Sequence, residues 1–303
     1  MRLLTITRTL VVLICLSTVP PTIAQEITID HAQGTTVLPV KPLKIFTYDP
    51  ASLDILDALD IEISGVPRSN IPSYLEKYKN EKYLKIGTLF QPDYETVQAE
   101  KPDLIIVASR SASAYKDLSA IAPTIDLTVP QDHFIAGVEK NVRTLGHIFN
   151  KDAEAAKLIA KLNASTVKIK EESHNVGNAL IIMTNGSKIT AYGTGSRFGW
   201  VHDDLGIKPT VADLNTATHG EAISFEFLLK ADPDWLFVLD RDSVVGNNAA
   251  SARQTLNNEL VAATNAARKN HIVYVDTERW YLVGGGISAL QASIDALAKI
   301  LSR

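Results

Sequence analysis

Short apolar segments rich in β-branched residues alternate along the chain with segments of helical periodicity, such as 52–59. The strand-like segments are 44–48, 104–108 and 124–129 in the first half, and 179–184, 235–239 and 272–275 in the second. Strands that are apolar at nearly every position and are separated by helices are typical of a parallel sheet covered on both faces. The pattern therefore predicts an α/β fold.

The segment between the two halves, residues 150–174, has a helical pattern and contains neither proline nor glycine. Its apolar stripe consists of Ala155, Ile159, Leu162 and Ile169. Lysines and glutamates occupy many of the remaining positions, as expected for a helix with one buried side. We interpret the segment as one long helix that joins two lobes, residues 25–149 and 175–303. An ordinary surface helix within a single domain is the alternative.

An internal repeat supports two lobes. Residues 94–110 and 225–241 align without a gap at a constant offset of 131, with five identical positions. Each copy carries a glutamate near its start, Glu95 or Glu226, and an arginine directly after a buried strand, Arg110 or Arg241. Ligands of open parallel sheets bind beyond the carboxyl ends of the strands. We therefore expect each lobe to direct an arginine into a shared cleft.

The first 24 residues are expected to be a cleavable signal peptide. Arg2 and Arg8 precede the apolar run 9–16. The segment ends in the run Thr22-Ile23-Ala24, and cleavage is expected after Ala24. The run is too short to span a membrane, which takes about 20 apolar residues. The single cysteine, Cys15, lies inside this segment and follows an isoleucine, which disfavours a lipid anchor. The mature protein is therefore expected to be exported.

Composition limits the classes of partner. The 303 residues are 46% hydrophobic with a formal net charge of −4, which excludes a disordered chain, a collagen and a basic nucleic-acid-binding module. Removal of Arg2 and Arg8 with the signal peptide changes the charge from −4 to −6. We expect neither nucleic acid nor an anionic membrane surface as a partner.

A third arginine, Arg197, lies in the glycine-rich run 192–199, YGTGSRFG. The glycines permit a tight turn between a strand and a helix, and the run lacks the Gly-Lys-Ser/Thr ending of a phosphate loop. A single arginine most often covers surface or pairs with a carboxylate. Three guanidinium groups at equivalent sheet edges instead suit an anionic ligand with paired oxygens.

The seven histidines are scattered, so the spacing predicts no metal site made by protein alone. His219 lies in the loop-like run 216–221, ahead of a predicted helix at 223–230, and Tyr281 follows the strand 272–275. A phenolate oxygen is a hard donor suited to ferric iron. A surface histidine is the alternative for His219, whereas the adjacent Trp280 is expected to pack inside the lobe.

Catalysis has no positive support in the sequence. There is no Gly-x-Ser-x-Gly elbow and no cysteine nucleophile in the mature chain. A secreted α/β enzyme acting on an anionic small molecule would need a base near Arg197, for which the local candidates are His202, Asp203 and Asp204.

Taken in chain order, five features resemble the class III periplasmic binding proteins of ABC importers for iron(III) catecholate siderophores. They are Arg110, GSRFG with Arg197, THG with His219, LDR with Arg241, and WYL with Tyr281. The resemblance implies two Rossmann-like lobes joined by a rigid helix, with the ligand held between them. It implies no intrinsic cofactor: the ligand is the ferric siderophore itself.

The resemblance also implies roles for these residues. The three arginines would contact catecholate oxygens, and His219 and Tyr281 would occupy the two iron positions that a tetradentate siderophore leaves open. Glu95 and Glu226 would dock a monomeric carrier on an inner-membrane permease dimer with its ATPase. Carriers of haem, cobalamin or a ferric hydroxamate are the alternatives within this class.

Overall fold

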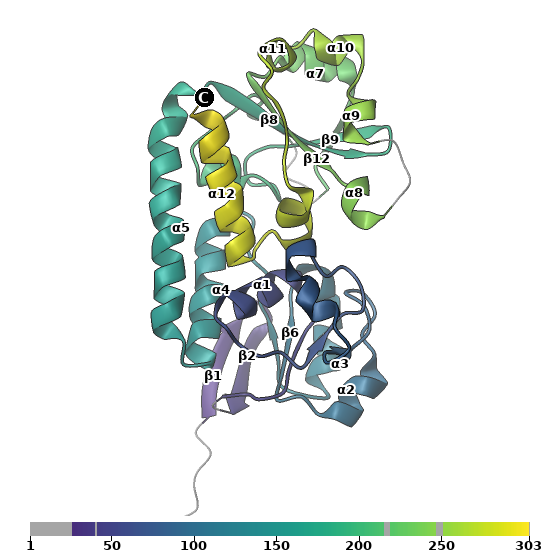
Figure 1. Ribbon diagram of the computed structural model, residues 1–303, viewed down its shortest axis with the longest axis vertical. Coiled ribbons are helices and arrows are strands. Elements are labelled where there is room, and N and C mark those ends of the chain that lie inside the picture. The colour runs from purple at the N-terminus through teal and green to yellow at the C-terminus, as the bar shows by residue number, and fades with distance from the viewer. Residues whose placement is uncertain (1–25, 40, 215–218, 247–250, 303) are drawn as a thin grey trace, which may run out of the picture.

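The computed structural model describes residues 26–39, 41–214, 219–246 and 251–302. The expected signal peptide, with Cys15, lies outside these residues. Figure 1 shows two lobes stacked along the long axis, with the N-terminal lobe below and the helix α5 (Asp152–Glu172) running beside both. The single linking helix expected from the sequence is therefore present. Within the described residues, every helix is too short or too polar to cross a membrane.

The N-terminal lobe is built on five parallel strands in the order β5-β4-β3-β6-β7. Their bounds are β3 Ile45–Thr47, β4 Gly65–Val66, β5 Leu84–Lys85, β6 Leu104–Val107 and β7 Thr124–Asp126. The lobe's helices are α1 Pro50–Ala58, α2 Tyr94–Glu100, α3 Tyr115–Ser119 and α4 Phe134–Ile148, with 3₁₀ segments η1 Ser73–Lys79 and η2 Ser109–Ala114. Every residue of β6 is buried, as the unbroken apolar run predicts for a central parallel strand. A hairpin of β1 (Glu26–His31) and β2 (Gly34–Pro39) lies against β7.

The C-terminal lobe has the strand order β11-β9-β8-β12-β13, and β10 also pairs with β8. The bounds are β8 Asn178–Asn185, β9 Lys188–Tyr192, β10 Lys208–Pro209, β11 Glu221–Ile223, β12 Trp235–Asp240 and β13 Ile272–Tyr274. The helices are α6 Trp200–Asp203, α7 Phe225–Ala231, α8 Asp242–Val245, α9 Ala252–Thr255, α10 Glu259–Ala262, α11 Asn265–Arg268 and α12 Ile287–Leu301. The 3₁₀ turn η3 Ser173–Asn175 follows α5, and the π-helix η4 Glu278–Val283 precedes α12.

The three strands predicted in this half are present as the parallel strands β8, β12 and β13. The apolar pattern did not predict the parallel strand β10 or the antiparallel strands β9 and β11. The helix expected over 223–230 begins instead at Phe225. Ile223 belongs to β11, and the side chain of Ser224 caps the helix by accepting a hydrogen bond from the Phe227 amide.

The two copies of the repeat share backbone stereochemistry as well as sequence. The helices α2 and α7 are both seven residues long and both end on a left-handed residue, Lys101 at φ 49° and Asp232 at φ 45°. The aspartate that follows, Asp103 or Asp234, accepts hydrogen bonds from backbone amides at the start of the lobe's central strands. These matches at the offset of 131 residues support a duplicated unit.

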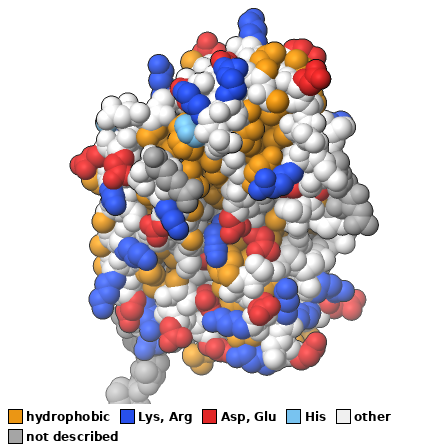
Figure 2. Space-filling model, turned by 45° about the horizontal axis from the view of Figure 1, so that its top comes forward, with side chains coloured by type: hydrophobic (Ala, Val, Ile, Leu, Met, Phe, Trp, Pro, Cys, Tyr) orange, Lys and Arg blue, Asp and Glu red, His pale blue; other side chains and the backbone are white. Residues whose placement is uncertain are grey.

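The C-terminal chain crosses back to the N-terminal lobe. After β13 it forms η4 and then α12, which packs against α1, α4 and α5 (Figure 1). Two segments therefore bridge the lobes: α5 by the covalent chain, and η4–α12 by packing contacts. On the face in Figure 2, acidic and basic side chains are interspersed around a hydrophobic band, so that face carries no continuous basic patch.

Candidate functional site

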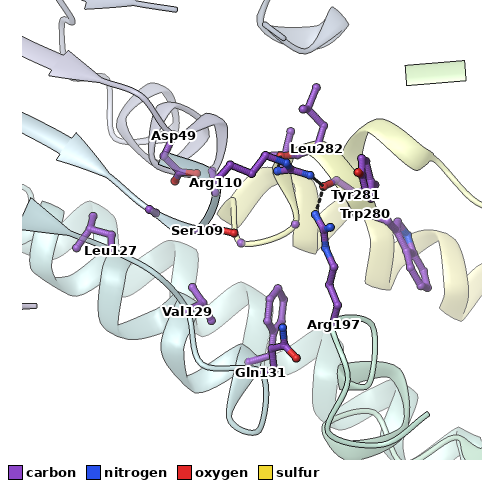
Figure 3. Close-up of a pocket in the computed structure, with 16 residues that line it drawn as sticks. Asp49, Ser109, Arg110, Leu127, Val129, Gln131, Arg197, Trp280, Tyr281 and Leu282 are labelled. Atoms are coloured by element: carbon purple, nitrogen blue, oxygen red, sulfur yellow. Dashed lines mark hydrogen bonds between the residues drawn. The ribbon is translucent and has the colours of Figure 1, made fainter. Parts of the chain in front are cut away.

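A cleft open to solvent lies between the lobes. The N-terminal lobe contributes Asp49, Arg110 and Gln131 to its lining, and the C-terminal lobe contributes Arg197 and Tyr281. Figure 3 shows Arg110 and Arg197 reaching from opposite lobes toward the same tyrosine. Because residues of both lobes line the cleft, its shape depends on how the lobes are held together.

Arg110 is placed by the end of the central strand β6. Ser109, two residues beyond the strand, adopts a left-handed conformation with φ 46° and starts the 3₁₀ turn η2. Its amide donates to the hydroxyl of Thr128 at 2.7 Å, which anchors the turn at the sheet edge. The Arg110 guanidinium donates across the cleft to the carbonyl oxygens of Tyr281 at 2.7 Å and Leu282 at 3.3 Å. The strand end thus delivers a cation to the opposite lobe, as predicted.

Arg197 is placed by the glycine-rich turn between β9 and α6. An added Cβ at Gly199 would lie 2.8 Å from the Gly195 amide, so the turn closes only with glycine at that position. Asp203 fixes the turn by accepting from the Gly195 amide at 2.7 Å. The Arg197 guanidinium donates to the Tyr281 carbonyl at 2.6 Å. Burial and the neighbouring charge of Arg110 lower the pKa of Arg197 to about 10, so it remains cationic at neutral pH.

Arg241 follows β12 and approaches the same tyrosine from its other end. Its Nε donates to the Tyr281 hydroxyl at 3.3 Å, and Nη1 donates to the side chain of Asn185 at 3.2 Å. The structure therefore brings the three predicted arginines together on one residue, although Arg241, unlike Arg110 and Arg197, is not among the described residues that line the cleft. The repeat equivalents Arg110 and Arg241 contact opposite ends of Tyr281, its carbonyl and its phenol.

Tyr281 is the centre of the cluster. Its ring lies 4.9 Å from the guanidinium carbon of Arg110 and 4.3 Å from that of Arg197, distances at which a cation is attracted to the ring face. Burial raises the pKa of the Tyr281 phenol, but the hydrogen bond from Arg241 and the three arginine charges outweigh it and lower the pKa below its ordinary value. The phenolate form of Tyr281 is therefore easier to reach than that of an ordinary tyrosine.

The π-helix η4 sets the direction of Tyr281. π-helical turns are rare in proteins, and those that occur are often found at functional sites. Its neighbour Trp280 is 4% exposed and packs on Trp200 at 4.9 Å between ring centres, which confirms the packing role expected for Trp280. The indole also borders the cleft, next to Tyr281.

His219 is adjacent to the cluster but its side chain is exposed and is not among the described residues that line the cleft. Its carbonyl accepts a hydrogen bond from the Tyr192 hydroxyl at 3.1 Å. The Tyr192 phenol is itself close enough to Arg197 and Arg241 for their charges to act on it. Among the described residues, no three His, Cys, Asp or Glu side chains are grouped as a metal site.

Asp49 is a cleft residue that the sequence interpretation missed. Its carboxylate caps α1 by accepting from the amide and hydroxyl of Ser52 at 2.7 and 2.8 Å. Burial raises the pKa of Asp49, an effect that the Ser52 hydrogen bonds and the charge of Arg110 oppose. The Asp-Pro pair at the start of a helix-like run was the available clue, because aspartate is a favoured N-cap and proline a favoured first residue.

The candidate bases for catalysis are engaged elsewhere. His202 is buried, and its Nδ1 lies 2.8 Å from the carbonyl of Ile207. Asp203 holds the Gly195 turn, and Asp204 lies 3.4 Å from the amide of Ile135. None of the three lines the cleft.

Glu95 and Glu226 are far from the cleft. Each is an exposed residue in the first turn of its helix, α2 or α7. In Figure 1 these helices lie toward opposite ends of the molecule. The two glutamates are thus equivalent in the repeat and available on the surface of separate lobes.

Known proteins resemble this chain over nearly its whole length. A family model described as periplasmic binding protein matches residues 45–278. The petrobactin-binding protein YclQ of Bacillus subtilis is 36% identical over 89% of this chain and 86% of its own length, and its crystal structure matches with a TM-score of 0.89 over 92% and 99% of the two chains. The ferric-anguibactin-binding protein FatB of Vibrio anguillarum is 33% identical over 90% and 87%. The periplasmic catecholate-siderophore binding protein VctP of Vibrio cholerae matches with a TM-score of 0.85 at 35% identity, over 90% and 100%.

We expect Arg241→Gln to raise the pKa of Tyr281, because the substitution removes the hydrogen bond and one of the three arginine charges that oppose the effect of burial. Phenolate absorbance is measured against pH, and subtraction of the same titration in a Tyr281→Phe background isolates this residue. Arg143→Gln, which removes an exposed arginine paired with Glu139 on α4, is the matched control. An unchanged Tyr281 titration in Arg241→Gln would contradict the electrostatic account.

Proposed function

The chain belongs to the periplasmic binding protein family, and we propose that it is the substrate-binding protein of an ABC importer that carries an anionic iron(III) catecholate siderophore between its lobes. The observation that carries this proposal is the convergence of Arg110, Arg197 and Arg241 on Tyr281. The names of relatives agree with it: YclQ binds petrobactin, VctP binds a catecholate siderophore and FatB binds ferric anguibactin.

The arginine cluster favours an anion over a neutral ligand. Each guanidinium has five N–H donors in a planar fork, and the hydrogen bonds to Tyr281 use only some of them. The remaining donors can contact the paired oxygens of a catecholate. Complexes of iron(III) with hydroxamates carry less negative charge than those with catecholates, so a hydroxamate carrier is the weaker alternative. Competition with haem, cobalamin and a ferric hydroxamate discriminates among these ligands.

Tyr281 and His219 are proposed to complete the iron coordination. Iron(III) takes about six donors, of which a tetradentate bis-catecholate supplies four. The arginines lower the pKa of Tyr281, so the phenol loses its proton to an incoming metal ion more easily, and His219 is held by its backbone beside the same cluster. Binding through the His219 imidazole requires that this exposed side chain turn toward the cleft. The protein thereby contributes two donors to the cargo and needs no resident cofactor.

The proposal assigns no catalytic step. His202, Asp203 and Asp204 stabilise local structure, and none of them reaches the cleft. We further propose export through the signal peptide 1–24 and action as a periplasmic monomer. Exposed Glu95 and Glu226 would dock the loaded carrier on the two halves of a permease dimer, one from each lobe.

We expect a ferric bis-catecholate to quench the fluorescence of Trp280 saturably at micromolar concentration, because this indole borders the cleft. Tyr281→Phe and His219→Ala should each weaken a tetradentate complex at least about tenfold, a loss of about 1.4 kcal/mol. A hexadentate complex, whose iron is already saturated, should lose much less. The titration is repeated with both ligands for each variant.

His147→Ala, an exposed histidine on α4, is the control for the histidine substitution. Equal losses for tetradentate and hexadentate complexes would remove the coordination role of His219 and Tyr281. Absence of saturable quenching by either complex in the wild-type protein would overturn the proposed function.

Glu95→Lys and Glu226→Lys should leave siderophore affinity unchanged and lower importer-dependent uptake of the ferric complex at least about tenfold, since each reverses the charge at one contact. Uptake by cells and affinity of the purified protein are measured for each variant. Glu171→Lys makes the same charge change at an exposed position of α5. Uptake that falls equally in Glu171→Lys, or is unchanged in the first two variants, would refute the docking role.

A further inference from the structure

Residues 278–289 follow the C-terminal sheet in sequence, yet the N-terminal lobe holds them at both ends. At the first end, the Glu278 carboxylate accepts from the Ser73 amide at 3.1 and 3.2 Å and from the Ser73 hydroxyl at 2.5 Å. Ser73 is the first residue of η1 in the N-terminal lobe. One C-terminal side chain is thus bonded to both donors of a single N-terminal residue.

At the far end, Asp54 of α1 caps the N-terminus of α12. Its carboxylate accepts from the amides of Ser288 at 2.7 Å and Ala289 at 3.2 Å, and from the Tyr74 hydroxyl at 2.6 Å. Asp54 is only 1% exposed, so loss of these partners would leave a buried polar group unsatisfied. A Cβ on Gly286 would lie 2.6 Å from the Asp54 carboxyl carbon, so this close approach requires glycine.

Two further contacts join the lobes along the same segment. Arg110 donates to the carbonyls of Tyr281 and Leu282, and the Arg279 guanidinium lies 4.4 Å from the ring centre of Tyr74. Tyr74 therefore connects the two ends, because its hydroxyl bonds Asp54 and its ring contacts Arg279. The N-terminal lobe therefore holds the segment by hydrogen bonds on both sides of Tyr281.

We propose that Asp54 and Ser73 are positioning residues for Tyr281. By holding the two ends of the segment 278–289, they fix the tyrosine relative to Arg110 of their own lobe. Tyr281 then moves with the N-terminal lobe, whereas Arg197 and Arg241 belong to the C-terminal lobe. The inference rests on the proposed function, because it assigns these contacts a consequence for binding at Tyr281.

The hydrogen bonds of Ser73 and Asp54 to the segment 278–289 also limit how the two lobes move relative to each other. A rotation of the lobes about α5 would have to break the Ser73 and Asp54 contacts together or bend the chain between β13 and η4, because the segment is held by the N-terminal lobe and continues from the C-terminal sheet. The segment therefore acts as a second restraint beside α5. A ligand that needs Tyr281 at a fixed place should depend on this restraint, and a ligand that does not need Tyr281 should not.

Two variants test the hydrogen bonds between Glu278 and Ser73. Glu278→Ala removes the acceptor, and Ser73→Ala removes the hydroxyl donor but keeps the amide. Amide hydrogen exchange of the apo protein should become faster over 278–289 and remain unchanged in β6 and β12. Affinity for a tetradentate ferric bis-catecholate should fall about tenfold, and affinity for a hexadentate complex less than about twofold. In a Tyr281→Phe background, Glu278→Ala should change tetradentate affinity less than about twofold.

Asp54→Asn keeps the volume of the side chain and should produce the same split between the two ligands. Glu76→Ala, an exposed glutamate on η1, is the matched control and should change neither the exchange rate nor the affinity.

Faster exchange with unchanged affinity for the tetradentate complex would overturn the positioning role. An equal loss of tetradentate affinity on Glu278→Ala in the wild-type and Tyr281→Phe backgrounds would also overturn it. Unchanged exchange in Glu278→Ala and Ser73→Ala would show that these contacts do not hold the segment. Wild-type protein that binds no ferric catecholate would overturn the proposed function, while the exchange measurement still decides whether the N-terminal lobe holds this segment.

Discussion

Three guanidinium groups converge on one tyrosine, and the rest of the site follows from how their mutual repulsion is accommodated. Arg110 and Arg197 share the Tyr281 carbonyl and contact its ring, while Arg241 bonds its phenol. A carbonyl dipole and an aromatic face attract cations without cancelling their charge. The cleft is therefore left with positive charge that an anion can neutralise, and with a phenol whose pKa is lowered.

Gene duplication explains how two of these cations reach one place. In each copy a capped seven-residue helix leads into a buried strand. The strand β6 ends at Val107, three residues before Arg110, and β12 ends at Asp240, directly before Arg241. Arg110 of the N-terminal lobe bonds the Tyr281 carbonyl, and Arg241 of the C-terminal lobe bonds its hydroxyl. The hydrogen bonds of Asp54 and Ser73 to the segment 278–289 then fix the position of Tyr281, on which the arginines converge.

Local patterns in the sequence account for most of the fold. The apolar strands, the helix α5 within 150–174 and the arginines at strand ends are set by short-range periodicity and by the repeat. The antiparallel strand β9 was missed, although Gly186-Ser187, a glycine-first pair typical of a two-residue hairpin loop, was an available clue. Gly186 has φ 58° there, as such a turn requires.

Features that depend on distant parts of the chain could not be predicted. The Asp54 carboxylate bonds amides more than 230 residues away, and no spacing in the sequence marks that pair. The place of the His219 backbone beside Tyr192 likewise depends on tertiary packing, because the two residues are 27 positions apart. The arginines were predictable because each stands at a strand end, whereas their common target, the Tyr281 carbonyl, is a backbone group that no residue pattern identifies.

A crystal structure of the protein with a ferric bis-catecholate tests the central claim most directly. The account predicts the complex between the lobes, with the Tyr281 oxygen bonded to iron and the guanidinium groups of Arg110, Arg197 and Arg241 on catecholate oxygens. A complex bound outside this cleft would contradict the account, as would one inside it whose iron has no bond to Tyr281 and whose catecholate oxygens contact none of the three arginines.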